Sequence, residues 1–181
     1  MHSRDASYIK NKASYGFTLV EVLVVLSITA IIVGAATPSF MNIMANNRVT
    51  AASNELVIAL NLAKSEAIRS GQTTMLCKSP EGNQCDNTAA WNSGLLLFQD
   101  SDNNQMVNNG ERIIKRIPAT EASLKFSHTG SSQNNIIFKA NGRSNSNGHF
   151  CFNNSYAEEN SRAVVFTQAG KVRTEKRPYD C

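Results

Sequence analysis

The sequence lacks the groupings of side chains on which most enzymes and zinc sites depend. Its three histidines are His2, His128 and His149. Neither of the last two can be matched in the sequence with a serine or cysteine nucleophile and an orienting acid. The four cysteines include no Cys-x-x-Cys pair, and the histidines do not fall at the spacing of a zinc site. We therefore predict that the chain is not an enzyme and binds no metal or other cofactor.

A large surplus of charge is also missing. The net charge is +4 over 181 residues, and half of it lies in the first sixteen, where Arg4, Lys10 and Lys12 outnumber Asp5. A balance this even excludes a general positive field that would draw the whole protein to nucleic acid. Any site for nucleic acid must therefore be a local patch.

Charge is almost absent from the stretch that follows, because Glu21 is the only charged side chain between residues 17 and 47. Residues 22–37 are almost wholly Val, Leu, Ile and Ala. A helix over residues 17–38 is roughly 30 Å long, which is about the thickness of the hydrocarbon core of a bilayer. We predict a membrane-spanning helix over residues 17–40. The basic residues ahead of it place the N-terminus in the cytoplasm and the body outside it.

The residues at the start of this run, Gly16-Phe17-Thr18-Leu19-Val20-Glu21, resemble the class III signal of type IV pilins and pseudopilins. The resemblance implies that a prepilin peptidase cuts after Gly16, that residues 1–16 are a leader, and that the new N-terminal Phe17 is methylated. The apolar helix is then retained. The chain is expected in the bacterial inner membrane as a single-pass protein with a periplasmic C-terminal domain, before it enters a filament. A plain single-pass anchor is the alternative.

Glu21 is the most distinctive single residue, because a carboxylate inside hydrocarbon is costly unless it has a partner. The nearest cation is the α-amino group of Phe17 after cleavage, on the same chain or on a neighbour. In the family, this residue is held to bring each subunit into register in the growing filament. The alternative is that Glu21 lies close enough to the membrane surface to stay hydrated.

A helical pattern continues beyond the apolar run, because small and apolar residues recur at three- and four-residue steps. Gly71 follows as a C-terminal stop. We predict one helix over residues 17–70, bent near Gly34 and Pro38. Its second half, within residues 41–71, is amphipathic and needs a surface on which to lay its apolar face.

Residues 72–181 contain short apolar runs separated by clusters of Asn, Gly and Ser, which is the pattern of strands and turns. We predict an α+β fold in which the long N-terminal helix packs, through its second half, on a C-terminal antiparallel sheet. The pilin resemblance implies the same arrangement. The predicted strands are Thr73–Lys78, Leu95–Gln99, Arg112–Ile117, Leu124–Phe126, Ile136–Lys139, His149–Phe152, Ala163–Thr167 and Lys171–Thr174.

The body is most similar to the minor-pilin group that includes FimT, FimU and the type II secretion pseudopilin GspH. The resemblance implies a minor pilin that primes or builds a type IV pilus, serving pilus assembly and motility or adhesion. The alternatives are pseudopilin H of a type II secretion system and a FimT-like minor pilin that binds double-stranded DNA in transformation. The implied partners are the prepilin peptidase, the inner membrane, and other pilins or pseudopilins. The matching segments are Asn61–Arg69, Thr73–Cys77, Leu97–Asp100, Phe126–Gly142 and Val164–Arg173.

The four cysteines, Cys77, Cys85, Cys151 and Cys181, suit an oxidising compartment such as a periplasm. Four cysteines allow three pairings. We expect Cys77 with Cys85, which are close in sequence, and Cys151 with Cys181. The second bridge would hold the last residue of the chain in place.

Local positive charge is densest near the C-terminus, where Lys171, Arg173, Lys176 and Arg177 face only Glu175. On a strand, Lys171 and Arg173 project to the same face, at a spacing that suits backbone phosphates. FimT-type pilins resemble this with a Gly-Arg-x-Arg motif implicated in DNA capture. Lys171 stands where that motif has its first arginine, and lysine lacks the bidentate fork. The alternative is a solubilising decoration of an edge strand.

Two further charged clusters are weaker candidates. The basic residues within 112–116 split across both faces of the predicted strand, and we interpret them as a solvated strand. The acidic segment 100–104 with Glu111 imitates the oxygen spacing of a calcium loop. The glycine that such a loop needs for its sharp turn is replaced by Gln105.

Overall fold

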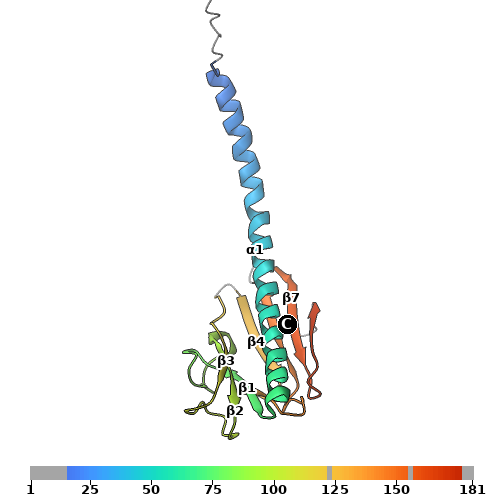
Figure 1. The fold of residues 1–181 in the computed structure, drawn as a ribbon. Coiled ribbons are helices and arrows are strands. Elements are labelled where there is room, and N and C mark those ends of the chain that lie inside the picture. The colour runs from blue at the N-terminus through green and yellow to red at the C-terminus, as the bar shows by residue number, and fades with distance from the viewer. Residues whose placement is uncertain (1–15, 122–123, 155–156, 177–181) are drawn as a thin grey trace, which may run out of the picture. The chain divides into compact units, whose positions relative to one another are not determined.

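The computed structural model describes residues 16–121, 124–154 and 157–176, apart from the side chains of residues 35–39, 125, 154 and 157–160. The chain divides into two compact units, Met1–Phe40 and Met41–Cys181. One helix, α1 (Leu19–Ser70), contributes to both (Figure 1). Its helical assignment continues through Gly34 and Pro38. The predicted bend there stays a prediction, and the side chain of Pro38 lies outside the described residues.

In the second unit, α1 buries the stripe that the spacing predicted. Leu56 is 3% exposed, and Ala59, Leu60, Ala63 and Ala67 are fully buried. The helix ends as expected, since Gly71 has a φ of 70° and its N–H donates to the carbonyl of Ala67 at 3.1 Å. A left-handed glycine just past the last helical turn is a common C-terminal cap.

The strands lie at all eight predicted positions, and most ends shift by a few residues, but the strand predicted from Ala163 begins at Ala157. They form two antiparallel sheets of four strands, β3-β2-β1-β5 and β4-β6-β7-β8, where a single sheet was predicted. A short 3-10 helix, η1 (Trp91–Ser93), precedes β2. The strands are β1 (Thr73–Lys78), β2 (Leu95–Asp100), β3 (Ile113–Ile117), β4 (Leu124–Gly130), β5 (Asn135–Phe138), β6 (Gly148–Asn154), β7 (Ala157–Phe166) and β8 (Val172–Lys176).

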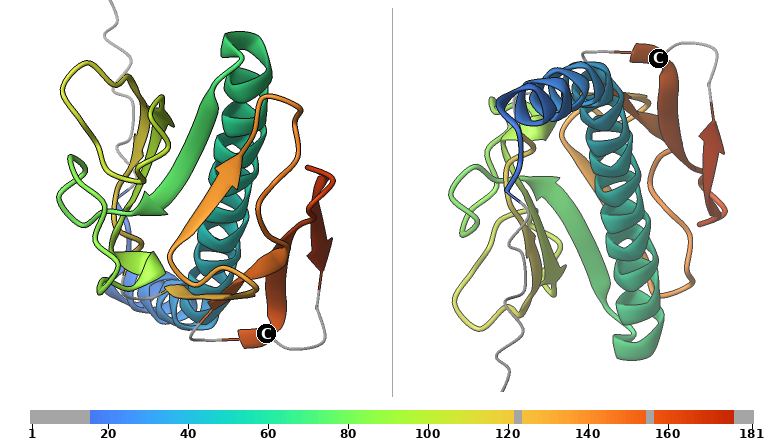
Figure 2. Two further views of the ribbon diagram at one scale, coloured as in Figure 1. Left: turned by 90° about the horizontal axis from the view of Figure 1, so that it is seen from below. Right: turned by 90° about the horizontal axis from the view of Figure 1, so that it is seen from above.

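The two sheets share the second half of α1 as their common support. Figures 1 and 2 show strands β1, β2 and β3 on one side of this half of the helix and β7 on the other. The largest apolar cluster draws on all three parts, with Leu60 from α1, Leu97 from β2 and Phe150 from β6. The predicted packing of an N-terminal helix on a C-terminal antiparallel sheet domain is thus confirmed.

The sheet that contains β1 and β2 is covered on both faces. Leu95 and Leu97 of β2 belong to the main cluster, whereas Leu96 and Phe98 belong to a second cluster on the other face. This explains why β2 reads as an unbroken apolar run rather than as an alternation, because neither face meets water.

The disulfide between Cys77 and Cys85 is confirmed. Cys77 belongs to the second cluster, and Cys85 packs against it, so the bridge fastens the loop after β1 over that face. Cys151 on β6 is also disulfide-bonded. Its predicted partner, Cys181, lies outside the described residues, so this pairing stays a prediction.

Candidate functional site

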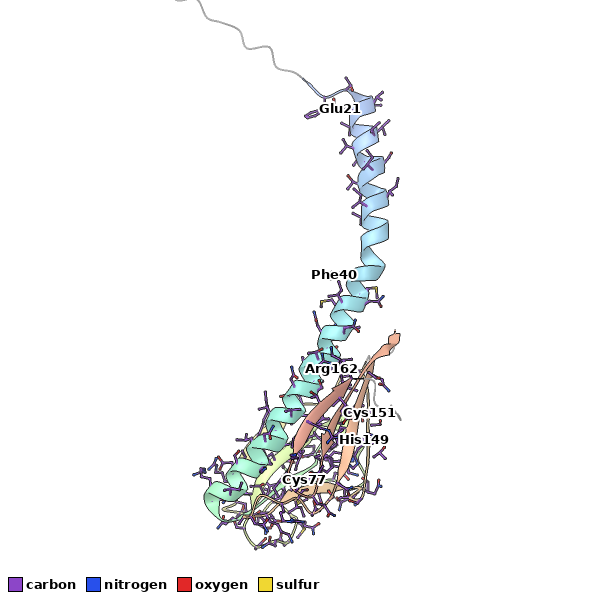
Figure 3. All side chains as sticks on the ribbon, turned by 90° about the vertical axis from the view of Figure 1, so that its right-hand side faces the viewer. Glu21, Phe40, Cys77, His149, Cys151 and Arg162 are labelled. Atoms are coloured by element: carbon purple, nitrogen blue, oxygen red, sulfur yellow. A yellow bond between two sulfur atoms is a disulfide. The ribbon has the colours of Figure 1, made fainter. Side chains whose placement is uncertain are left out.

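The start of α1 has the N-cap half of a capping box, in which Thr18 is the cap and Glu21, labelled in Figure 3, lies in the first turn. The hydroxyl Oγ1 of Thr18 accepts a hydrogen bond from the backbone N–H of Glu21 at 3.2 Å. The carbonyl of Thr18 accepts the first helical bond, from Val22. Thr18 belongs to the motif quoted from the sequence, but no capping role was predicted for it, although the spacing Thr-x-x-Glu is the known signal for this cap.

The carboxylate of Glu21 pairs with no side chain of the described residues, and Glu21 is exposed. A carboxylate in the first turn is favoured by the helix dipole, which is a local reason for an acid here. The helix dipole does not occupy the carboxylate oxygens, so they can still bind a partner from outside the described residues.

The first unit exposes apolar side chains on every side of its helix. Phe17 is 81% exposed, Leu19 75% and Ile31 72%. The hydroxyl groups of Ser27 and Thr29 donate to the carbonyls of Leu23 and Val25 at 2.7 Å, so they need no outside partner. A helix that is apolar all round is one that a membrane or other helices cover.

No helix within the described residues is both long enough and apolar enough to count as a membrane span. The span predicted over residues 17–40 includes residues 35–39, whose side chains lie outside the described set.

The predicted basic cluster near the C-terminus is only partly available. Lys171 precedes β8 and is exposed, and Arg173 and Lys176 lie in β8. Arg173 donates from Nε to Oε1 of Glu175 at 2.7 Å, because residues two apart share one face of a strand. This ion pair neutralises part of the patch. Arg177 lies outside the described residues, and DNA binding stays a prediction.

The turn before β8 is fastened to α1. The carbonyl of Gly170 accepts a hydrogen bond from Nζ of Lys64 at 2.9 Å. A Cβ atom on Gly170 would lie 2.0 Å from the carbonyl oxygen of Gly142, so the two turns touch through their backbones. The segments Phe126–Gly142 and Val164–Arg173, which carried the family resemblance, therefore meet here.

The basic residues within 112–116 lie at the surface, as the interpretation of a solvated strand expects, and they also have partners. Arg112 and Lys115 pair with Glu66 and Glu55 of α1 at 3.5 and 3.1 Å. Arg116 points the other way, and its Nε donates to the carbonyl of residue 82 at 2.7 Å. These contacts tie β3 to α1 and to the disulfide loop.

The acidic cluster serves the loop after β2. The carboxylate oxygens of Asp100, Asp102 and Glu111 lie within 4.8 Å of one another. Asp100 is 1% exposed and accepts hydrogen bonds from the N–H groups of Asn104 and Gln105 at 3.1 and 3.2 Å. Burial raises the pKa of Asp100. These bonds give the carboxylate a structural role, and the absence of a metal stays a prediction.

His128 of β4 lies in an aromatic cluster with Trp91, Phe150 and Phe166. Its ring centroid is 4.5 Å from that of Phe150 and 5.0 Å from that of Trp91. Both ring nitrogens are buried and have no hydrogen-bond partner among the described residues. Burial, with smaller contributions from the charges of His149 and Lys78, lowers the pKa of His128 to about 4. The ring is therefore neutral near pH 7 and acts as a core aromatic.

Sequence comparisons agree on the class of protein. A family model described as type II transport protein GspH matches residues 52–170, and a prokaryotic N-terminal methylation motif matches residues 11–37. Two curated fimbrial proteins of Pseudomonas aeruginosa are each 34% identical over 97 residues, which is 51% of this chain and 62% of theirs. The chain thus matches less than two thirds of the length of these relatives.

Solved structures share the fold. The type IV minor pilin FimU of Pseudomonas aeruginosa matches with a TM-score of 0.56 and 20% identity, over 75% of this chain and 96% of FimU. The minor pseudopilin EpsH from the type 2 secretion system of Vibrio cholerae matches with a TM-score of 0.52 and 13% identity, over 71% and 97%. Because the family model covers more than half of the sequence, this chain belongs to the GspH family, and it carries a prokaryotic N-terminal methylation motif.

Proposed function

We propose that this protein is a minor pilin, a structural or priming subunit of a type IV pilus. A prepilin peptidase removes residues 1–16, Phe17 becomes the methylated N-terminus, and residues 17–40 hold the protein in the inner membrane until it enters the filament. In the filament, the same apolar helix packs among the helices of neighbouring subunits. The protein acts by assembly and not by catalysis.

One observation carries the proposal. Glu21 is the only charge in an otherwise apolar and exposed helical segment, and its carboxylate pairs with no side chain of the described residues. An unpaired carboxylate in apolar surroundings is costly. The free α-amino group of Phe17 on a neighbouring subunit is the partner that offsets this cost, so that assembly and charge pairing occur together.

The test replaces Glu21 in cells that build the filament and lack the native copy. We expect Glu21→Ala to remain in the membrane fraction at the wild-type level and to fall to background in sheared filaments. Ser27→Ala is the matched control, because its hydroxyl is satisfied within the helix and its loss should leave incorporation unchanged. Wild-type incorporation of Glu21→Ala would refute the proposed role.

A pseudopilin of type II secretion is the second candidate, favoured by the name of the matching family model. The two candidates share the leader, the helix and Glu21, so that the variant above does not separate them. Deletion of the gene does: loss of pili with normal protein export supports the pilus, and loss of export with normal pili supports the secretion system.

DNA capture is a third candidate, supported by the exposure of Lys171 and Arg173 and opposed by the ion pair of Arg173 with Glu175. A gel-shift assay with double-stranded DNA at low salt tests it. No retardation, or retardation unchanged in the double variant Lys171→Ala and Arg173→Ala, would remove this function.

A further inference from the structure

A cavity of about 230 Å³ opens beside α1 in the second unit. Its walls come from α1, η1, β2, β4, β6, the end of β3 and the segment that follows β3. The innermost side chains are apolar and nearly inaccessible to water, with at most 9% of their surface exposed. They are Leu56, Trp91, Leu95, Leu124 and Phe152.

Two ion pairs stand beside the cavity, and each joins α1 to the opposite wall. Arg48 of α1 pairs with Glu121 at 3.0 Å, and Glu55 of α1 pairs with Lys115 of β3 at 3.1 Å. Along α1, the positive Arg48 therefore comes first and the negative Glu55 second. On the opposite wall, the negative Glu121 faces Arg48 and the positive Lys115 faces Glu55. The side chains in these pairs are 28–65% exposed, so they remain open to a partner.

The size of the cavity indicates what it can hold. Pockets for drug-sized ligands and cofactors measure about 300–1,000 Å³, and this cavity is smaller. It suits one large apolar side chain, as in the anchor residues that fill pockets at the centres of protein interfaces. The two ion pairs carry no net charge together, so they give no attraction for polyanions such as nucleic acid or anionic lipid headgroups, whereas their alternating charges suit a polypeptide.

We propose that this cavity receives one large apolar side chain of a neighbouring pilin-like subunit, with charged residues of that subunit meeting the two ion pairs. The inference rests on the proposed function, because it assumes that such a subunit lies against α1. This contact involves the sheet domain and adds to the helix packing described above.

Site-specific photocrosslinking of the full-length protein, in cells that build the filament, tests the proposal. A photoreactive amino acid at Ala119, an exposed residue lining the cavity, should give an adduct with a large apolar residue of an identified pilin-like subunit. In the Ala52→Phe background, which fills the cavity, we expect at least about tenfold less adduct. The same probe at Asn109, an exposed loop position away from the cavity, serves as the control.

A second variant guards against misfolding of the filled cavity. The double substitution Glu55→Lys and Lys115→Glu keeps the ion pair but reverses its direction, and it should also reduce the adduct. The fluorescence of Trp91, the single tryptophan, reports whether each variant is folded. Provided that the wild type enters filaments, three results would overturn the inference. They are an undiminished yield of adduct in both variants, an adduct with lipid, and the absence of any adduct at Ala119. A wild type that never enters filaments would overturn the proposed function as well.

Discussion

Gly170 and Gly142 show how a single missing Cβ can decide the packing of two turns. Both have positive φ angles, 71° for Gly170 and 75° for Gly142. The carbonyl oxygen of Gly142 lies where a Cβ atom on Gly170 would be. The turn before β8 lies against Lys64 of α1, and the turn at Gly142 lies against Lys64 and Ile68.

We expect Gly170→Ala to lower the free energy of unfolding by roughly 2–4 kcal/mol, because it adds a backbone clash to an unfavourable φ. Gly110→Ala is the control, since Gly110 has a φ of 96° with nothing within 4 Å of the added methyl group. It should cost about 1 kcal/mol. Chemical denaturation of both variants measures the difference, and equal losses would contradict the clash.

His128 makes stability depend on pH in a predictable direction. Its pKa falls from 6.5 to about 4 in the folded chain, so protons bind more readily to the unfolded state. The contribution of His128 to the free energy of unfolding is constant above about pH 6.5. It declines as the pH falls from there to about 4, and it stays low at still lower pH. After allowance for partial exposure of the ring, the loss is on the order of 1–2 kcal/mol.

The variant His128→Phe keeps an aromatic ring beside Phe150 and Trp91 and removes the titration. We expect its unfolding free energy to fall less steeply than that of the wild type between pH 6.5 and 4. Denaturant titrations across this range give both curves. Parallel curves would show that His128 does not contribute to the acid sensitivity.

At the scale of elements, β1 is joined to α1 by a buried hydroxyl. Thr74 is fully buried, and its Oγ1 donates to the carbonyl of Ala63 at 2.8 Å. Sequence reasoning placed both residues in the correct elements, but the bond itself depends on how the strand lies on the helix. It supplements the apolar contacts of Ala63 and Ala67 with a directional one.

Thr74→Val keeps the shape of this side chain and removes the donor. We expect a loss of about 1 kcal/mol in the free energy of unfolding. Thr73→Val, one residue earlier and partly exposed, should change stability by much less. Thermal unfolding of the two variants side by side provides the comparison, and a smaller loss at position 74 than at 73 would be evidence against the bond.

For the whole molecule, maturation is the property that the sequence predicts most directly. Protein extracted from the membranes of its own cells should have the intact mass of a chain that begins at Phe17, carries one N-methyl group, and has all four cysteines oxidised. A mass that still includes residues 1–16, in cells with an active prepilin peptidase, would leave only an anchored sheet domain.

The sequence by itself determined the features that depend on near neighbours along the chain. Hydropathy, helical spacing and turn residues act over a few residues. They predict the apolar run in which Glu21 is the single charge, the cap at Gly71 and the positions of the eight strands. The pairing of Cys77 with Cys85 was predictable for the same reason.

The tertiary structure alone decided how distant segments meet. β5 leaves the order of the chain to pair with β1, while β4 pairs with β6, so that two sheets form around α1 instead of one. The pairing of Lys115 with Glu55, the contact of Gly170 with Gly142 and the cavity beside Trp91 all follow from that arrangement. Strand order is set by which apolar faces cover the helix together, and no local pattern records that choice.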